Sequence, residues 1–201
     1  MRDDYYPFVN LPLPYGYGAM EPYIDEKTMR VHHNGHLEAY ISKLNAALKE
    51  RPGLQMLPLA ALVRGGALLG EEVARNAGGV YNHRFYFELL QNPADREPHG
   101  ALRKAIERDF GGFAQFREEF KKAALSVFGS GYAWLAAERG RLAILTTGNQ
   151  DNPLQRGMKP VLNVDVWEHA YYLKHQYRRA DYIEDWFKII NWPRAESNFL
   201  G

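Results

Sequence analysis

Hydrophobic positions in residues 21–50 recur at mixed spacings of three and four, which is the period of a helix with one buried face. The segment reads EPYIDEKTMRVHHNGHLEAYISKLNAALKE and follows an irregular stretch, LPLPYGYG, rich in proline and glycine. The Arg-Pro-Gly sequence at residues 51–53 stops the pattern. We therefore expect one long helix here.

A second helical region follows in residues 57–92. Residues 57–79 predict shorter helical pieces interrupted by glycine, and VYNHRFYFELLQN resumes an aromatic helical pattern that ends before Pro93. Two long helices joined by a loop predict a helical hairpin. We assign this hairpin to an N-terminal domain of residues 1–92.

The pattern of hydrophobic and polar residues changes after PADREPHG, residues 93–100. Helical periodicity comes first, and YAWLAAE and RLAILTTG then flank an Arg-Gly turn, which predicts two paired strands. PVLNVDVW predicts a third strand that leads into a helix carrying His169, and DYIEDWFKIINW predicts a closing amphipathic helix. The sequence therefore predicts an α+β fold, in which residues 93–201 form a mixed α/β domain with a small antiparallel sheet of about three strands and surrounding helices.

Composition narrows the function classes. The formal net charge is +1, so bulk electrostatics gives no reason to expect nucleic acid or a membrane surface as a partner. The chain contains no cysteine, which excludes disulfides, thiolate metal sites and thiol nucleophiles, and leaves histidines and carboxylates as the strong metal ligands. We see neither a signal-peptide-like apolar segment nor a stretch near the roughly 20 apolar residues of a membrane span, and we expect a cytoplasmic protein.

Candidate ligands lie on separate predicted elements. His32 and His36 share one face of the first helix at a four-residue spacing, and Tyr40 extends that face by one turn. His83 lies in the second helical region among aromatic residues, which predicts a dry environment. Alone, such a histidine would more often be a hydrogen-bonded core residue.

Asp165 ends the predicted third strand, and His169 lies one turn further on, so both side chains can converge on one point. By itself this pair would more often be a solvated ion pair on a helix. Together, three imidazoles and one carboxylate in a chain without thiols favour a first-row metal such as Fe, Mn or Zn.

One stretch of the sequence indicates the protein family more specifically than the spacing of the candidate ligands does. DVWEHAYYLKHQYRRADY, residues 165–182, resembles the signature of the iron/manganese superoxide dismutase family, and LPLPYGYGAMEPYIDEKTMRVHH, NAGGVYNH, AIERDF, FGSGYAWL and GNQDNP agree in the same order. The resemblance implies an enzyme that converts superoxide to dioxygen and hydrogen peroxide by cycling one Mn or Fe ion per subunit between its trivalent and divalent states. It also implies a metal site between the two domains, held by His32, His83, Asp165 and His169.

The resemblance extends to residues around the metal. It implies that Gln150 tunes the redox potential by a hydrogen bond to metal-bound solvent, and that Gly79 marks the manganese-type branch, so manganese is favoured over iron. Tyr40 with His36 matches the family's proton relay at the mouth of the substrate channel.

The same resemblance implies an assembly. Glu168 would cross a twofold interface to hydrogen-bond the ligand histidine of the other subunit, and Tyr172 would reach the partner's His36. We therefore expect a homodimer, which could pair further into a tetramer.

The chain departs from the family pattern near the metal. Phe87 and Tyr132 stand where most members have tryptophan, whereas Trp134 and Trp167 are retained. We expect smaller rings to loosen the packing around the metal, and a buried Tyr132 hydroxyl to need a hydrogen-bonding partner.

Gly35 and Leu37 replace residues that are commonly Lys and His in the family, which removes a cation near the channel.

Two alternative functions stay open. One is a family-like metal-binding protein with weak or no dismutase activity. The other is a zinc hydrolase, which is disfavoured because no HExxH helix places a general base beside paired ligands.

Overall fold

The computed structural model describes residues 4–94 and 97–201. Its first long helix consists of three consecutive segments, α1 (Glu26–Val31), a π-helical turn (His32–Leu37) and α2 (Glu38–Lys49). Asp25 caps the start, since its side chain accepts a hydrogen bond from the backbone N–H of Thr28 at 2.8 Å. The expected helix is confirmed, but it begins later than predicted and contains a π-helical turn that the hydrophobic pattern did not indicate.

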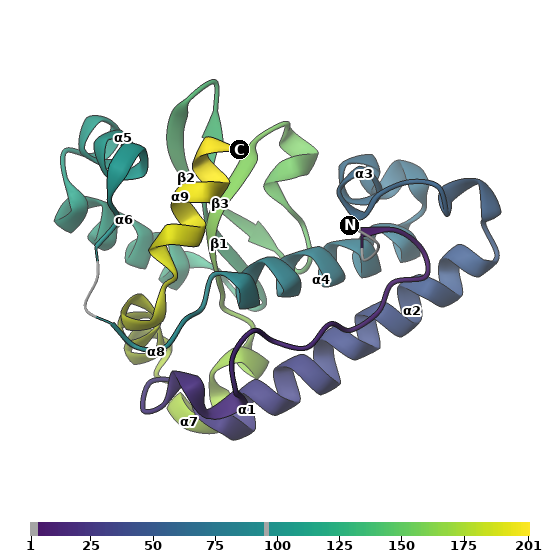
Figure 1. The fold of residues 1–201 in the computed structure, drawn as a ribbon, viewed down its shortest axis with the longest axis horizontal. Helices are drawn as coiled ribbons and strands as arrows, with labels where there is room; N and C mark the ends of the chain where they lie inside the picture. Colours follow the sequence, from purple (N-terminus) through teal and green to yellow (C-terminus); the bar gives the residue numbers. More distant parts are fainter. Residues whose placement is uncertain (1–3, 95–96) are drawn as a thin grey trace.

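The second helical region contains α3 (Leu59–Gly65), the 3₁₀ turn Gly66–Leu69 and α4 (Glu71–Glu88). The helix α4 passes through Gly78 and Gly79 without a break, so the interruption expected there is wrong. Antiparallel packing of α4 on α2 forms the predicted hairpin (Figure 1).

The second half begins with α5 (Gly100–Phe110) and α6 (Phe113–Ser126). Three antiparallel strands follow in the spatial order β2-β1-β3: β1 (Gly131–Glu138), β2 (Arg141–Gly148) and β3 (Lys159–Asp165). The β1–β2 turn places both Arg139 and Gly140 at positive φ, 49° and 78°, as a two-residue hairpin turn requires. The predicted α+β fold and small sheet are confirmed.

The chain after β3 is more broken than expected. It forms the 3₁₀ turn Glu168–Ala170, then α7 (Tyr172–His175), α8 (Arg179–Trp186), the 3₁₀ turn Phe187–Ile189 and α9 (Trp192–Leu200). His169 therefore lies on a 3₁₀ turn rather than on a regular helix. The single closing helix predicted for residues 181–192 is also wrong, because α9 begins where it should have ended.

One apolar core joins the two halves. Strand β3 contacts both α4 and α9, so the sheet lies between these two helices. Figure 1 shows α4 passing below the strands on its way back from α3. This packing brings the middle of α4 against the end of β3. No helix within residues 4–94 and 97–201 has both the length and the apolar character that crossing a membrane would require.

Candidate metal centre

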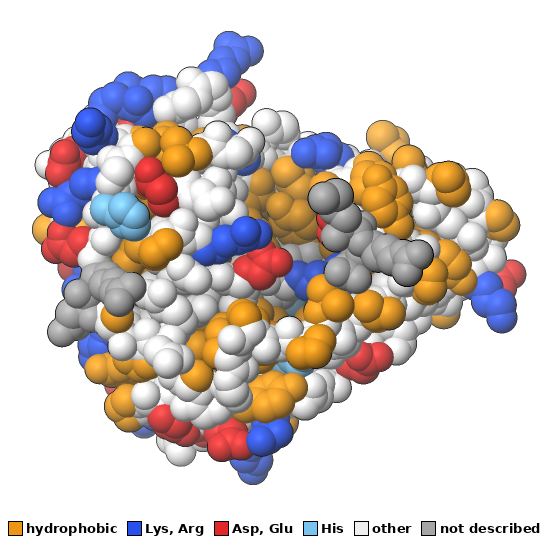
Figure 2. Space-filling model, viewed as in Figure 1, with side chains coloured by type: hydrophobic (Ala, Val, Ile, Leu, Met, Phe, Trp, Pro, Cys, Tyr) orange, Lys and Arg blue, Asp and Glu red, His pale blue; other side chains and the backbone are white. Residues whose placement is uncertain are grey.

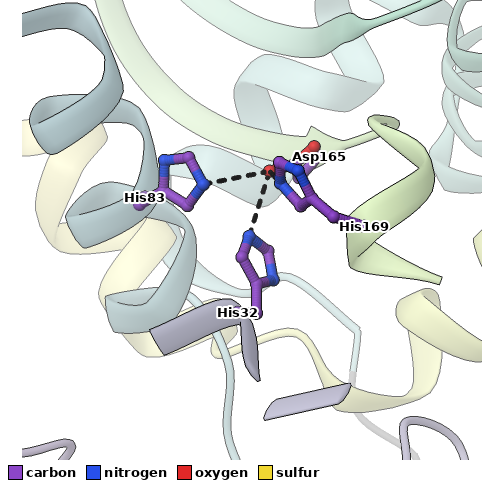
Figure 3. A group of neighbouring side chains, drawn as sticks. All are labelled: His32, His83, Asp165 and His169. Atoms are coloured by element: carbon purple, nitrogen blue, oxygen red, sulfur yellow. Dashed lines mark hydrogen bonds and ion pairs between the residues drawn. The ribbon is translucent and has the colours of Figure 1, made fainter. Parts of the chain in front are cut away.

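Four side chains from four elements converge where the hairpin meets the sheet (Figure 3). His32 opens the π-helical turn, His83 lies on α4, Asp165 ends β3, and His169 lies on the 3₁₀ turn that follows. One ligand atom from each lies within 4.8 Å of the others, and all but His169 are buried. The structure thus brings together the four residues that the sequence predicted as ligands.

The carboxylate of Asp165 is the centre of the group. Its Oδ2 atom lies 3.3 Å from His32 Nε2, 3.4 Å from His169 Nε2 and 3.9 Å from His83 Nε2. The Nε2 atoms of His32 and His83 are buried and carry no hydrogen bond among the described residues. Buried polar atoms without a partner are costly, and a cation at the common point would satisfy them together with the carboxylate. The residues therefore fit a metal ion with three nitrogen ligands and one oxygen ligand.

The protonation states also suit a cation. Burial lowers the pKa of His32 to about 4, and burial together with the neighbouring His32 lowers the pKa of His83 well below its usual value. Burial alone would raise the pKa of Asp165, but the close approach of His169 and His32 outweighs burial and holds that pKa well below its usual range. The site thus presents neutral imidazoles and an anionic carboxylate, the forms that bind metals.

Hydrogen bonds fix the orientation of the ligands. His83 Nδ1 donates to the backbone oxygen of Gly79 at 2.7 Å, which leaves Nε2 unprotonated and directed at Asp165. The backbone N–H of Trp167 donates to Asp165 Oδ1 at 2.9 Å, and the Tyr182 hydroxyl donates to the Asp165 backbone oxygen at 2.9 Å. Asp165 is therefore held from both its side chain and its main chain.

Aromatic rings enclose the ligands. The Phe87 ring centroid lies 4.9 Å from that of His32, and the Trp167 ring stacks on His169 at 5.4 Å and 22°. Tyr132 meets His83 edge to face at 6.5 Å. Trp134 is buried one layer further out, where its ring contacts Tyr132 and its indole N–H donates to Thr147.

Phe87, one of the two rings that stand in place of tryptophan, borders a cavity. A cavity of about 360 Å³ adjoins Phe87 and is lined in part by Pro12, His33 and Leu37. Phe87 lines this cavity, and its ring contacts that of His32 edge to face.

Tyr40 and Gln150 form a polar cluster beside the ligands. Gln150 Nε2 donates to the Tyr40 hydroxyl at 3.1 Å, and Asn82 Nδ2 donates to Gln150 Oε1 at 3.1 Å. The Tyr40 ring lies flat against Gly79, because a Cβ built there would stand only 2.3 Å from Tyr40 Cδ1. Gly79 therefore makes the room that Tyr40 occupies.

His36, Glu168 and Tyr172 lie on the outer side of the site. The His36 ring stacks on His169 at 4.0 Å and 24°, and burial lowers the pKa of His36. Glu168 is exposed, and Tyr172 is 49% exposed. Within the described chain, the Glu168 carboxylate makes no hydrogen bond or ion pair, and Nδ1 of His169 makes no hydrogen bond.

A hollow of about 870 Å³ reaches this polar cluster from the solvent. Tyr40, Gln150 and Trp167 lie among its lining residues, together with the cations Lys43 and Arg75. Arg75 is paired with Glu71 at 2.7 Å, and Glu72 and Asp151 also line the hollow. Among the described residues, the exposed Lys43 forms no ion pair, so its charge can act on an anion that approaches this opening. Figure 2 shows acidic and basic side chains interspersed on the face that it presents.

Sequence reasoning missed two residues that hold the site together. Asn82 positions Gln150, and Tyr182 bonds both Asp165 and the Tyr86 hydroxyl. Asn82 directly precedes His83, but nothing in a single sequence indicates that its amide turns toward Gln150. Tyr182 closes the DVWEHAYYLKHQYRRADY stretch, and its distance from Asp165 along the chain hides the contact.

Two family models cover most of the chain. The model described as iron/manganese superoxide dismutases, alpha-hairpin domain, matches residues 8–91, and the model described as iron/manganese superoxide dismutases, C-terminal domain, matches residues 98–198.

Curated relatives match over nearly their full length. A superoxide dismutase [Mn] of Thermus thermophilus is 46% identical over 199 residues, covering 96% of this chain and 98% of the relative. A superoxide dismutase [Mn] of Thermus aquaticus is 45% identical over 201 residues, covering 98% of each chain. One of Pseudomonas aeruginosa is 45% identical over 193 residues, covering 94% of this chain and 95% of the relative.

Proposed function

The chain belongs to the iron/manganese superoxide dismutase family, and we propose that its dismutase activity rests on one ion held by His32, His83, Asp165 and His169. The reaction consumes two superoxide ions and two protons and yields one dioxygen and one hydrogen peroxide. The buried convergence of three imidazoles on one carboxylate oxygen carries the proposal. When bound, the ion supplies the redox chemistry, accepting an electron from one superoxide and returning an electron to another.

The ligands set the balance between these half-reactions. Asp165 keeps its negative charge and so favours the oxidised ion, whereas three neutral imidazoles moderate that preference. The bond from Trp167 N–H to Asp165 Oδ1 holds the carboxylate with Oδ2 toward the three histidines. The bond from His83 to Gly79 keeps the ligand nitrogen of His83 free of a proton.

Tyr40 is the proposed proton donor to the reduced substrate. Because its hydroxyl oxygen accepts a hydrogen bond from Gln150, its own O–H proton stays free to face the channel. Burial raises the pKa of Tyr40, so the phenol remains protonated at neutral pH. His36 lies one helical turn before Tyr40, and its ring stacks on that of His169. His36 completes the proposed relay at the channel mouth.

Manganese is the proposed resident metal. Gln150 and Gly79 occupy the positions that predicted a manganese-type site, and the relatives described above carry manganese in their names. The resemblance implies that iron-type members usually carry this glutamine near the second histidine ligand instead. The contact between Tyr40 and Gly79 supports manganese, because a glutamine side chain at residue 79 would overlap the Tyr40 ring. Gln150 supplies the amide in its place.

We further propose the homodimer, with Glu168 reaching the partner's His169 and Tyr172 reaching the partner's His36. Support comes from two groups on adjacent residues that have no hydrogen-bonding partner among the described residues, the Glu168 carboxylate and His169 Nδ1. An isologous twofold contact would satisfy both groups twice.

Exposed apolar residues supply area for the same interface. Phe128 is fully exposed, and Tyr177 is 80% exposed. Arg179 ties their two segments together, since it follows Tyr177 closely in the chain and donates to the backbone oxygens of Val127 and Gly129. Exposed aromatic rings of this size are candidates for burial in an interface.

Three finer points stay proposals. We place the domain division between residues 92 and 93, which agrees with the gap between the two matched regions. We propose a cytoplasmic location, which cell fractionation tests. Pairing of dimers into a tetramer is tested by measuring the mass of the assembly in solution.

Metal content and superoxide decay, measured on one purified sample, test the function. We expect manganese-loaded protein to accelerate superoxide decay, and a sample that stays metal-bound and dimeric without doing so would refute the proposal. His83→Ala should lose the metal, whereas His99→Ala removes an exposed histidine at the start of α5 and should keep it. Reconstitution with iron, assayed in parallel, tests the choice of metal.

A further inference from the structure

Asn152 is a buried polar residue that the proposed function leaves unused. It lies between β2 and β3, directly before the 3₁₀ turn Pro153–Arg156. Its Oδ1 atom accepts a hydrogen bond from the backbone N–H of Leu154 at 2.8 Å, and Gln155 Oε1 accepts one from the backbone N–H of Asn152 at 3.0 Å. This capping box explains the oxygen of the Asn152 side chain but not its NH₂ group.

The NH₂ group connects Asn152 to the metal site. Asn152 Nδ2 donates at 2.7 Å to Oδ1 of Asn82, a buried residue that directly precedes the ligand His83 on α4. Asn82 Nδ2 donates to Gln150 Oε1 at 3.1 Å, and Gln150 Nε2 donates to the Tyr40 hydroxyl at 3.1 Å. Three side-chain amides therefore form an unbroken chain of hydrogen bonds from the capped turn to Tyr40.

Main-chain groups fix the direction of this chain at two points. The Leu154 N–H can only donate, so Asn152 turns its oxygen to Leu154 and its nitrogen to Asn82. The backbone oxygen of Gln150 can only accept, and it lies 3.2 Å from Asn82 Nδ2, so Asn82 turns its nitrogen to Gln150. Gln150 consequently presents an N–H group, and not its oxygen, to Tyr40. The second N–H of Gln150 Nε2 takes no part in this chain.

We propose that Asn152 is a positioning residue for the dismutase reaction, a role that rests on the metal site of the proposed function. Asn152 acts through Asn82, which it holds in the orientation that makes Gln150 a donor to Tyr40. Hydrogen bonds that run in one direction along a chain polarise one another, so each amide supports the next.

Loss of the donor at Asn152 should reach Gln150. Asn82 Oδ1 has no other hydrogen bond among the described residues, so without Asn152 it becomes a buried acceptor with no partner. Because such a group is costly, Asn82 should shift toward another donor and release Gln150 Oε1. The amide of Gln150 would then lose its fixed orientation beside the ligands.

Asn152→Ser separates the bond to Asn82 from the cap. Serine is as good an N-cap as asparagine, and Ser-Pro-Leu-Gln still forms a capping box, so the turn should persist with no change of charge. The serine side chain is one bond shorter than that of asparagine, so it leaves Asn82 Oδ1 without its donor. Asn152→Asp keeps the cap and the size but has no N–H, and is a second variant with the same expected effect.

Asn191→Ser is the matched control. Asn191 caps α9, since its Oδ1 accepts from the backbone N–H of Arg194 at 3.0 Å. Among the described residues, its side chain makes no hydrogen bond to Asn82 or Gln150. This variant therefore makes the same change at a cap that lies outside the amide chain.

Hydrogen exchange in the metal-free protein tests the positioning without any activity. We expect the side-chain amide protons of Asn82 and Gln150, followed by nitrogen-15 NMR, to exchange roughly two- to tenfold faster in Asn152→Ser, as the loss of one hydrogen bond implies. Asn191→Ser should show the parent's exchange rates. Unchanged rates in folded Asn152→Ser and Asn152→Asp would overturn the proposal.

Redox titration of the manganese-loaded proteins tests whether the effect passes through Gln150. At a fixed applied potential, Asn152→Ser should change the ratio of oxidised to reduced metal in the same direction as Gln150→Ala and by a smaller factor, while Asn191→Ser should match the parent. Adding Asn152→Ser to Gln150→Ala should produce no further change, because the group through which Asn152 acts is then absent. Additive changes, or an unchanged ratio in Asn152→Ser, would overturn the positioning role. Superoxide decay by the parent reports separately on the proposed function, so the two can fail independently.

Discussion

Gly79 and the Tyr40 ring compete for one small volume beside His83. Because a Cβ at Gly79 would lie 2.3 Å from the Tyr40 ring, Gly79→Ala should displace Tyr40 from Gln150. We expect a loss of about 1–3 kcal/mol in the free energy of unfolding, as is typical of overpacking, and a slower proton-dependent step. Chemical denaturation and superoxide decay at several pH values measure both effects.

Gly35→Ala is the matched control. Gly35 lies in the π-helical turn, and the nearest atom to its added Cβ is Val31 Cγ1 at 3.9 Å. The change should alter stability by no more than about 1 kcal/mol. Equal losses in both variants would contradict the steric role of Gly79.

Gln150 connects Tyr40 to Asn82 by hydrogen bonds beside the metal ligands. Gln150→Ala removes the donor to Tyr40 and the acceptor for Asn82, but it leaves the ligands in place. We expect the midpoint potential of the bound metal to shift while the far-ultraviolet circular dichroism stays that of the parent. An unchanged redox titration would count against tuning by Gln150.

The buried histidines also predict a pH dependence in the metal-free protein. Burial lowers the pKa of His32 to about 4, whereas an unfolded histidine titrates near 6.5. Between these values the unfolded chain binds a proton that the folded chain does not, so stability should fall as the pH drops from about 6.5 to about 4. The loss from His32 should reach about 3 kcal/mol.

Denaturation of the metal-free protein across this pH range measures the loss. His32→Gln removes one titrating group and should make the pH dependence shallower, with His83 still contributing, whereas His99→Ala should leave the dependence that of the parent. A metal-free parent whose stability does not change between these pH values would show that His32 is not held neutral.

At the scale of elements, the π-helical turn aligns the inner and outer parts of the site. His32 opens this turn, His36 lies within it, and Tyr40 follows it on α2. A π-helix has more residues per turn than an α-helix, so residues four apart stay closer to one face. Such turns occur frequently at functional sites.

Deletion of Gly35 would test the turn. Removing one residue should restore α-helical geometry and rotate Tyr40 away from Gln150 relative to His32, with loss of most dismutase activity and a smaller loss of helix content. Deletion of Gly53, in the connection after α2, is the control and should preserve activity. Retained activity in the Gly35 deletion would contradict the alignment.

The elements that the sequence predicted well are those governed by local chemistry. The strand pair β1–β2 follows from alternation around Arg139–Gly140, and the long first helix follows from its hydrophobic period. The α9 start was also readable, because Asn191 caps it and Pro193 follows in its first turn, yet the predicted closing helix runs through Asn191 to Trp192.

The incorrectly predicted break in α4 arose from contacts between residues that are distant in the sequence. Gly78 and Gly79 suggested a break in α4, but they are there for close approach. A Cβ at Gly78 would stand 2.2 Å from the Gln150 backbone oxygen, and one at Gly79 would strike Tyr40. No local pattern distinguishes such a glycine from a helix breaker. The ligands were predictable from residue type and resemblance, whereas the bonds of Asn82 and Tyr182 depend on contacts between distant segments.

At the scale of the molecule, the metal site is the junction of two parts that fold around different local patterns. The hairpin supplies His32 and His83, and the sheet and the turn after it supply Asp165 and His169. The ligands meet only when α4 packs on β3, so metal binding and docking of the two halves should stabilise each other.

The same logic extends to the second copy proposed above. If Glu168 bonds the partner's His169, Glu168→Ala removes two symmetric charge-assisted hydrogen bonds from each dimer. Each such bond contributes about 1.5–3 kcal/mol, so the dimer dissociation constant should rise at least tenfold, and metal should be released more readily from His169. Sedimentation velocity over a range of concentrations, with metal analysis of each fraction, measures both. Glu138→Ala makes the same chemical change at an exposed position at the end of β1 and should leave both quantities unchanged. A parent that stays monomeric, or a Glu168→Ala protein with the parent's dissociation constant, would show that the outer face of the site is completed within a single chain.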